Sequence, residues 1–120
     1  MAVAPDTGLE GFLASLRRCG IEAVVEAGVV AFVVEPMAGV RAGAAVPTGV
    51  GTDELATWPA VPPHWVHFPG EVGFTNSNTQ PSSRPGWTKH SRNIQRWGNA
   101  AEPAQAWLAH VRTIAGEAIA

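Results

Sequence analysis

The apolar positions predict a helix near each end of the chain. Between Thr7 and Gly20, apolar residues recur at helical spacing. Thr7 and Glu10 have the spacing of a capping box, and glycine is typical of the position after a helix ends. We therefore predict a first helix over residues 8–19 and a second from about residue 102. The second helix has an apolar stripe made of Ala104, Trp107, Leu108, Val111, Ile114 and Ala115.

Strand signals follow the first helix. Residues 21–26 and 29–35 are rich in β-branched side chains, and they predict two strands joined by a tight turn at Ala27-Gly28. The second of these runs is apolar from Val29 to Val34. It therefore predicts a central strand that is covered on both faces.

Two further strands and a loop are predicted beyond residue 43. Residues 44–50 indicate a weak third strand, which Pro47 and Gly49 confine to an edge of the sheet or shorten. Another strand is predicted over residues 64–68. Residues 75–86 are polar and rich in turn-forming residues, and such a long loop is often functional or mobile.

This order predicts an α+β fold. It has an N-terminal helix, an antiparallel meander of three to four strands, a long polar loop and a C-terminal helix. The 120 residues correspond to one domain spanning residues 1–120, and 46% hydrophobic residues suffice for one core. No apolar run approaches the roughly 20 residues that span a bilayer.

The segment between the third and fourth strands has an uncommon order of prolines. Residues 58–68 read Trp-Pro-Ala-Val-Pro-Pro-His-Trp-Val-His-Phe. Each proline fixes its own φ and favours an extended conformation in the residue before it. We therefore predict a stiff, non-helical corner. It consists of Trp58, Pro59, Pro62 and Pro63 together with the two residues between them.

This corner resembles the Tyr-Pro-x-x-Pro-Pro-x-Val-x-Phe corner of ubiquitin-conjugating (E2) enzymes, with Trp58 in place of the tyrosine and Phe68 one residue late. The segment from Trp87 to Arg92, followed by Trp97, is similar to a Trp-x-x-x-Ser-Arg segment of divergent prokaryotic E2-like families. The resemblance implies the E2 (UBC) fold and a place in a bacterial ubiquitin-like conjugation system. Some such systems serve antiviral defence.

The E2 cysteine is missing. In the family it lies about eight residues before a tryptophan that Trp97 matches, so its position falls near Lys89, where this chain has no cysteine. A thioester requires a thiolate, which a hydroxyl or an ammonium does not replace at neutral pH. The resemblance therefore implies a binding or scaffolding role, with an E1-like enzyme, a ubiquitin-like protein or another E2-like protein as partner. The alternatives are acyl transfer through an atypical residue or a partner's cysteine, and a generic α+β interaction domain.

Other catalytic or metal chemistry has little support in the sequence. His64 and His67 are three apart on a predicted strand and should point to opposite faces, which disfavours a shared metal ion. His90 and Ser91 are adjacent, and no carboxylate between residues 72 and 101 could orient them. We predict no catalytic residue, no metal and no cofactor.

The lone cysteine, Cys19, cannot form an internal disulfide, and its presence is typical of a protein in the reducing cytoplasm. It falls at the end of the first predicted helix, where the helix dipole disfavours a thiolate. The N-terminus has no signal-peptide pattern. We predict a cytoplasmic protein with an inert or structural thiol.

Positive charge is concentrated in residues 81–98. This segment holds four basic residues and no acidic one, a charge of +4, whereas the rest of the chain carries −6. Arginine and tryptophan favour the centres of protein interfaces, so the segment favours an acidic protein partner over single-stranded nucleic acid. The predicted binding residues are Trp87, Lys89, His90, Arg92 and Arg96.

Overall fold

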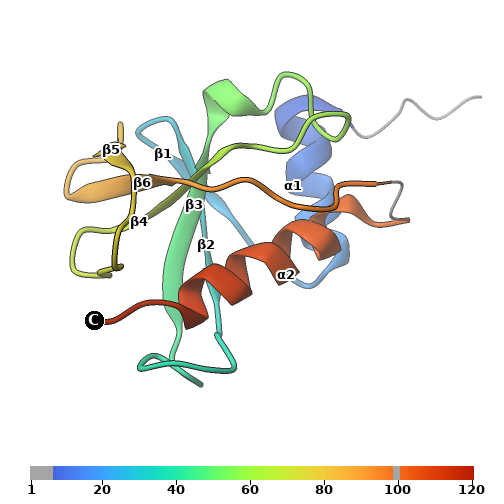
Figure 1. Cartoon of the computed structure of the whole chain (residues 1–120). Helices are drawn as coiled ribbons and strands as arrows, with labels where there is room; N and C mark the ends of the chain where they lie inside the picture. The colour runs from blue at the N-terminus through green and yellow to red at the C-terminus, as the bar shows by residue number, and fades with distance from the viewer. Residues whose placement is uncertain (1–6, 99–100) are drawn as a thin grey trace, which may run out of the picture.

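The computed structural model describes residues 7–98 and 101–120. These residues form an α+β fold in which two α-helices cover one side of a six-stranded antiparallel open sheet (Figure 1). The elements are α1 (Gly8–Arg18), β1 (Val24–Glu26), β2 (Val29–Val34), β3 (Val46–Gly51), the 3-10 turn η1 (Thr52–Glu54), β4 (Trp65–Pro69), β5 (Thr79–Pro81), β6 (Trp87–Ser91) and α2 (Pro103–Gly116). None of the helices within these ranges is both long enough and apolar enough to cross a membrane.

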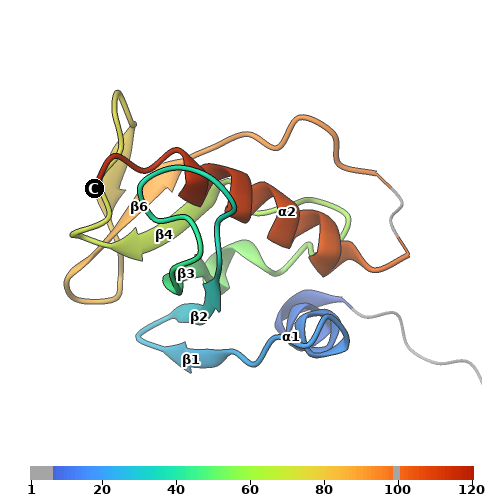
Figure 2. The same cartoon turned by 90° about the horizontal axis from the view of Figure 1, so that it is seen from below.

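The strand order in the sheet is β1-β2-β3-β4-β6-β5 (Figure 2). The sheet has more strands than the three to four that we predicted, because the region predicted as a polar loop contributes β5 and pairs it with β6. All three residues of β5 are exposed. An exposed strand carries no alternation of apolar and polar residues, so this hairpin had no recognisable pattern.

Of the two alternatives predicted for β3, an edge position or a shortened strand, the edge position is wrong. This strand lies between β2 and β4, in the interior of the sheet. It pairs with β2 at six positions, whereas its register with β4 is defined by one pair, Gly49 with His67. Pro47 itself pairs with Val33 of β2, and no ladder pair with β4 is defined at its position.

The hairpin of β1 and β2 is confirmed. Ala27 and Gly28 form its turn with φ of 53° and 77°, the two positive values that a type I′ turn requires. The prediction that β2 is covered on both faces holds only in part. Val29 and Val30 are fully buried, but Val33 is 47% exposed.

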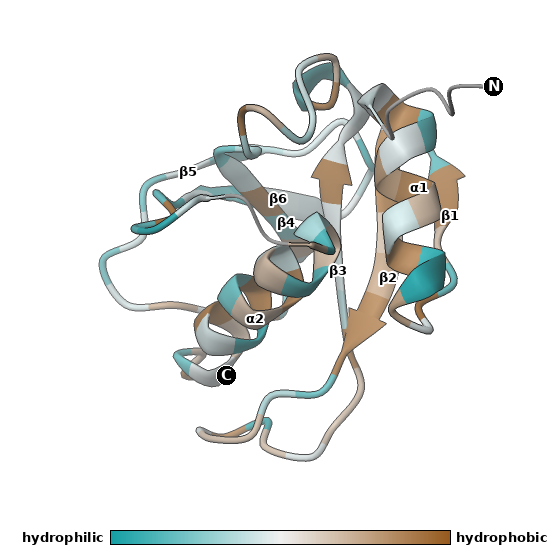
Figure 3. Cartoon of the chain, turned by 90° about the vertical axis from the view of Figure 1, so that its right-hand side faces the viewer, coloured by the Kyte–Doolittle hydropathy of each residue, from teal (hydrophilic) through white to brown (hydrophobic). Residues whose placement is uncertain are grey.

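The helices pack as predicted, although α1 is capped differently. Thr7 has the extended backbone of an N-cap, but its side chain makes no capping hydrogen bond, so the predicted capping box is absent. All six residues of the predicted apolar stripe on α2 are buried. The core lies between the helices and the sheet (Figure 3). Its largest fully buried side chains are Phe12, Leu16, Leu55, Trp58, Phe68, Trp107 and Leu108.

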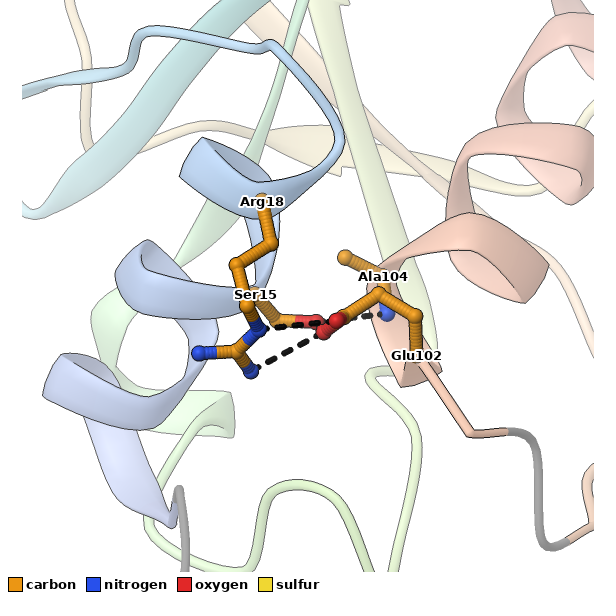
Figure 4. Close-up of polar contacts among 4 residues, drawn as sticks. All are labelled: Ser15, Arg18, Glu102 and Ala104. Carbon is orange, nitrogen blue, oxygen red and sulfur yellow. Dashed lines mark hydrogen bonds and ion pairs between the residues drawn. The ribbon is translucent and has the colours of Figure 1, made fainter.

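A polar cluster joins the ends of the two helices (Figure 4). The Ser15 hydroxyl accepts a hydrogen bond from the Ala104 N–H at 3.0 Å and donates one to Glu102 Oε1 at 2.5 Å. Arg18 donates to both oxygens of the same carboxylate, at 2.7 and 2.9 Å. The Glu102 side chain does not cap its own helix. A residue of α1 therefore supplies the acceptor that the first turn of α2 requires.

Candidate functional site

The candidate site is β6 and the segment that follows it, residues 87–98. Lys89 pairs with His67, and His90 pairs with Val66, which belongs to the core. Because side chains alternate along a strand, Trp87 and Lys89 lie on the face of the sheet away from the helices, and His90 points toward the core. The five predicted binding residues therefore do not share one surface.

His90 is an interior residue. Its side chain is 4% exposed, and its ring packs edge-on against Phe68 and Phe74, with centroids 5.8 and 4.7 Å away. Its Nδ1 lies 2.7 Å from the Ser77 hydroxyl. Burial, with a smaller contribution from Arg92, lowers the pKa of the imidazole to about 4. His90 is therefore neutral at physiological pH and contributes to packing.

Three cations of this segment are not neutralised. Lys89 lies over the Trp65 ring at 4.9 Å. Arg92 donates to the Ser77 hydroxyl at 3.0 Å and to the Ser91 carbonyl at 2.8 Å. Arg96 is exposed. Within residues 7–98 and 101–120, none of the three forms an ion pair with a carboxylate.

Arg84, the fourth basic residue of the segment 81–98, contacts Trp87 and a carboxylate on β1. Arg84 pairs with Glu26 at 2.9 Å and lies over the Trp87 ring at 4.3 Å. Trp87 is thus covered by Arg84 on the helix-free face. The remaining cations are Lys89, Arg92 and Arg96. Lys89 lies over Trp65 on the helix-free face, whereas Arg92 contacts Ser77 and Phe74, as His90 does. The name basic surface is used for these three residues below.

Trp97 anchors the segment that carries the basic surface. Its ring lies 5.3 Å from that of Trp58, and its Nε1 donates to the Pro59 carbonyl at 2.7 Å. Trp58 is 1% exposed and packs edge-on against Phe12 at 4.7 Å. Residues 58–63 form neither helix nor strand between η1 and β4. Two indoles therefore connect this proline-rich segment to the chain that follows β6.

Three histidines in or next to the sheet each contact a serine. His90 contacts Ser77, and His67 Nδ1 lies 2.8 Å from the Ser82 hydroxyl. His64 Nε2 forms a short hydrogen bond with the Ser91 hydroxyl. The adjacent pair considered from the sequence, His90 and Ser91, points to opposite faces. The sequence did not indicate that Ser91 meets His64, because that contact depends on the register of β4 with β6.

The His64 imidazole lies beside the Ser91 hydroxyl as a general base lies beside a nucleophile. The carboxylate of Glu54 is close to this pair, but it has another role. Glu54 accepts the backbone N–H groups of His64 at 2.9 Å and of Trp65 at 3.2 Å. Burial raises the pKa of this carboxyl despite these bonds. Glu54 therefore holds the start of β4, and its hydrogen bonds go to backbone N–H groups rather than to the imidazole that it would have to orient.

His67 is buried on the helix-free face. It is 3% exposed, and burial together with Lys89 lowers its pKa to about 4. Gly49, its partner on β3, contributes no side chain on that face. In the described part of the chain, no group of three or more histidine, cysteine, aspartate or glutamate side chains could hold a metal ion.

Cys19 lies at the end of α1, in a hollow of about 330 Å³ that Glu102 and Leu108 also line. Burial raises the pKa of its thiol, and the Glu102 carboxylate raises it further, whereas Arg18 and Arg112 lower it. A thiol with a raised pKa is a poor nucleophile at neutral pH. The environment of Cys19 is that of an inert thiol.

Comparisons of the chain with protein-family models, with curated proteins and with solved structures found no match in any of the three. The resemblance to E2 enzymes therefore rests on residues 58–68 and 87–97 alone.

Proposed function

We propose that this chain is a non-catalytic E2-like protein that binds a protein partner in a bacterial ubiquitin-like conjugation system. The order of elements supports the proposal in its outline: a helix, three antiparallel strands, the proline-rich segment, three further strands and a final helix. The sequence has no cysteine between residues 75 and 97, where the family carries its nucleophile. The role that fits these features is binding or scaffolding.

The observation that carries the binding role is the basic surface. Lys89, Arg92 and Arg96 are not paired with carboxylates in the described part of the chain, which has a negative net charge elsewhere. A local field of opposite sign steers an acidic partner and raises its association rate. The partner is an activating enzyme, a ubiquitin-like protein or a second E2-like protein with an acidic face.

The test is a charge reversal at two of these residues. Arg92 donates hydrogen bonds to the Ser77 hydroxyl and to the Ser91 carbonyl, so its replacement would also remove structural contacts. The variant is therefore Lys89→Glu with Arg96→Glu. Its matched control is Arg17→Glu with Arg41→Glu, which changes the net charge equally at positions outside the basic surface. Affinity for purified activating enzyme and ubiquitin-like protein from the same gene neighbourhood is measured by biolayer interferometry.

We expect the first double variant to lose at least about tenfold in affinity and the control to lose less than about threefold. Equal losses would mean that only the net charge matters. Unchanged binding of the first variant, with an unchanged thermal melt, would show that the basic surface is not the binding site.

A second candidate function is acyl transfer through Ser91, and the contact with His64 favours it. In this scheme the Ser91 hydroxyl attacks the thioester carbonyl of an activated ubiquitin-like protein. His64 Nε2 takes the hydroxyl proton, the C–S bond breaks, and the departing thiolate receives that proton. The product is an ester on Ser91.

Such an ester would survive a thiol reductant, and mild base would cleave it. It would be absent in Ser91→Ala, and its rate of formation would fall in His64→Gln. These properties distinguish it from a thioester on Cys19, which a thiol reductant cleaves.

A further inference from the structure

The helix-free face of the sheet contains a groove that the basic surface does not include. The turn between β5 and β6 reaches the turn between β1 and β2, where the Ser83 hydroxyl donates to the Ala27 carbonyl at 2.7 Å. The pair of Arg84 and Glu26 makes a second link between these turns. Beside them lies a groove of about 620 Å³. We call it the outer groove.

The lining of the outer groove is apolar and open to solvent. Val24 on β1 is 66% exposed, and Val33 on β2 is 47% exposed. Pro47, Pro69 and Trp87 also line it. Figure 3 colours β1 and β2 as hydrophobic over much of their length. Such side chains at neighbouring positions of one face form a surface that gains free energy when it is covered.

Carboxylates line the same groove. Glu22, Glu26 and Glu71 are among its lining residues, and Arg84 is the one basic residue there. Arg84 pairs with Glu26, and neither Glu22 nor Glu71 forms an ion pair within the described ranges. The groove therefore carries net negative charge, opposite in sign to the basic surface.

Arg84 shows how a cation is held in this groove. Its guanidinium lies 4.3 Å from the centre of the Trp87 ring and 2.9 Å from the Glu26 carboxylate. An indole face and a carboxylate together form a favourable site for a cationic side chain. Glu22 and Glu71 offer further carboxylates to cations that come from outside the chain.

The backbone beside the groove is also available. β1 is the terminal strand of the sheet, and all three of its residues are exposed. An extended peptide that adds to such an edge alternates its side chains between the two faces, so only every second side chain faces the groove. A peptide that lies across the groove itself can place apolar side chains over Val24 and Val33, and its long basic side chains can reach Glu22 and Glu71.

We propose that the outer groove binds an extended segment of a partner protein in which lysine or arginine residues alternate with apolar ones. This site is independent of the basic surface, because its charge has the opposite sign and its lining residues are different. A protein with both sites can hold an acidic partner and a basic segment at the same time. That property suits a scaffold.

The test uses the full chain labelled with ¹⁵N and the peptide acetyl-Lys-Val-Lys-Val-Lys-amide, followed by NMR titration. We expect shifts of the amides at 24–26, 31–33 and 84–87. The dissociation constant should rise at least about fivefold in Glu22→Gln with Glu71→Gln, and it should rise with salt. The matched control, Glu10→Gln with Glu117→Gln, removes two carboxylates that do not line the groove and should bind as the unmodified chain does.

Two comparison peptides complete the test. In the Glu-Val and the Gln-Val peptide, glutamate or glutamine replaces each lysine of the test peptide. Both should bind at least about fivefold more weakly than the Lys-Val peptide. Equal binding of the Gln-Val peptide would reduce the site to an apolar contact and overturn the proposal. So would shifts confined to residues 89–97, no shift at millimolar peptide, or equal effects of the two double variants.

Discussion

Ser15 on α1 accepts a hydrogen bond from the backbone N–H of Ala104 at the first turn of α2, 89 residues further along the chain. Ser15 is fully buried, and it also donates to Glu102. The acceptor that stabilises the start of one helix is thus provided by the other. Their packing and the capping of α2 are coupled through one hydroxyl.

Replacing this hydroxyl should destabilise the protein. Ser15→Ala leaves the Ala104 N–H without its acceptor and Glu102 with Arg18 alone as a donor, so we expect a loss of about 1–3 kcal/mol in the free energy of unfolding. Urea denaturation measures it. Thr7→Ala is the matched control, because Thr7 is an N-cap residue whose side chain makes no capping bond. Equal losses in the two variants would show that Ser15 has no special role.

Stability should fall as the pH decreases from about 6.5 to about 4. His67 and His90 have pKa values lowered to about 4 in the folded chain, against 6.5 for an ordinary histidine. Between these values the unfolded state binds more protons, so the free energy of unfolding rises with pH and is fully present above about 6.5. Each imidazole should contribute roughly 1–3 kcal/mol to this dependence.

The measurement is urea denaturation between pH 7 and pH 5, where most carboxylates stay ionised. The double variant His67→Gln with His90→Gln should show a flatter dependence on pH than the unmodified chain. The same slope in both proteins would mean that the two histidines ionise normally.

Removing the Trp97 indole should lower the free energy of unfolding. Trp97→Ala deletes the contact with Trp58 and the hydrogen bond to Pro59, and we expect a loss of about 2–4 kcal/mol. Trp97→Phe keeps an aromatic ring and should lose about 1 kcal/mol, mainly from the missing bond. Arg96→Ala, at the exposed neighbouring position, should change stability by less than about 0.5 kcal/mol. A neutral Trp97→Ala variant would contradict the packing described above.

Gly49 tests the interior position of β3. A Cβ atom at Gly49 would lie 2.5 Å from Val29 Cγ1 and 2.8 Å from the Val30 carbonyl oxygen. Gly49→Ala should therefore destabilise the protein by about 2 kcal/mol or more, because backbone must shift. Gly98→Ala meets no atom within 4 Å and should be nearly neutral. Thermal denaturation of the two variants distinguishes them, and similar melting temperatures would argue against this packing.

The elements with local signals could be predicted from the sequence. The spacing of Phe12 and Leu16, and the stripe on α2, follow the helical period, and Ala27-Gly28 fits its hairpin turn. The central position of β3 could not be predicted, since a strand with Pro47 and Gly49 has an edge-strand composition. The β5–β6 hairpin was missed because its first strand buries nothing.

The candidate site was predictable to a similar extent. The concentration of charge at Lys89 and Arg96 could be seen in the sequence, and the structure leaves both cations without a paired carboxylate in the ranges described. The burial of His90 and the contact of Ser91 with His64 depend on strand register. Register follows from the hydrophobic pattern and the turn geometry of paired strands, and the pairing of β4 with β6 spans the unrecognised strand β5.

The most direct test of the central claim, a binding role without acyl transfer, is the intact mass of the chain after incubation with a cognate activating enzyme, its ubiquitin-like protein and ATP. We predict that the mass stays unchanged under non-reducing conditions, while the same mixture contains a non-covalent complex that Lys89→Glu with Arg96→Glu weakens. A mass increase equal to the ubiquitin-like protein less one water would contradict the claim. Loss of that increase in Cys19→Ser or in Ser91→Ala would identify the nucleophile.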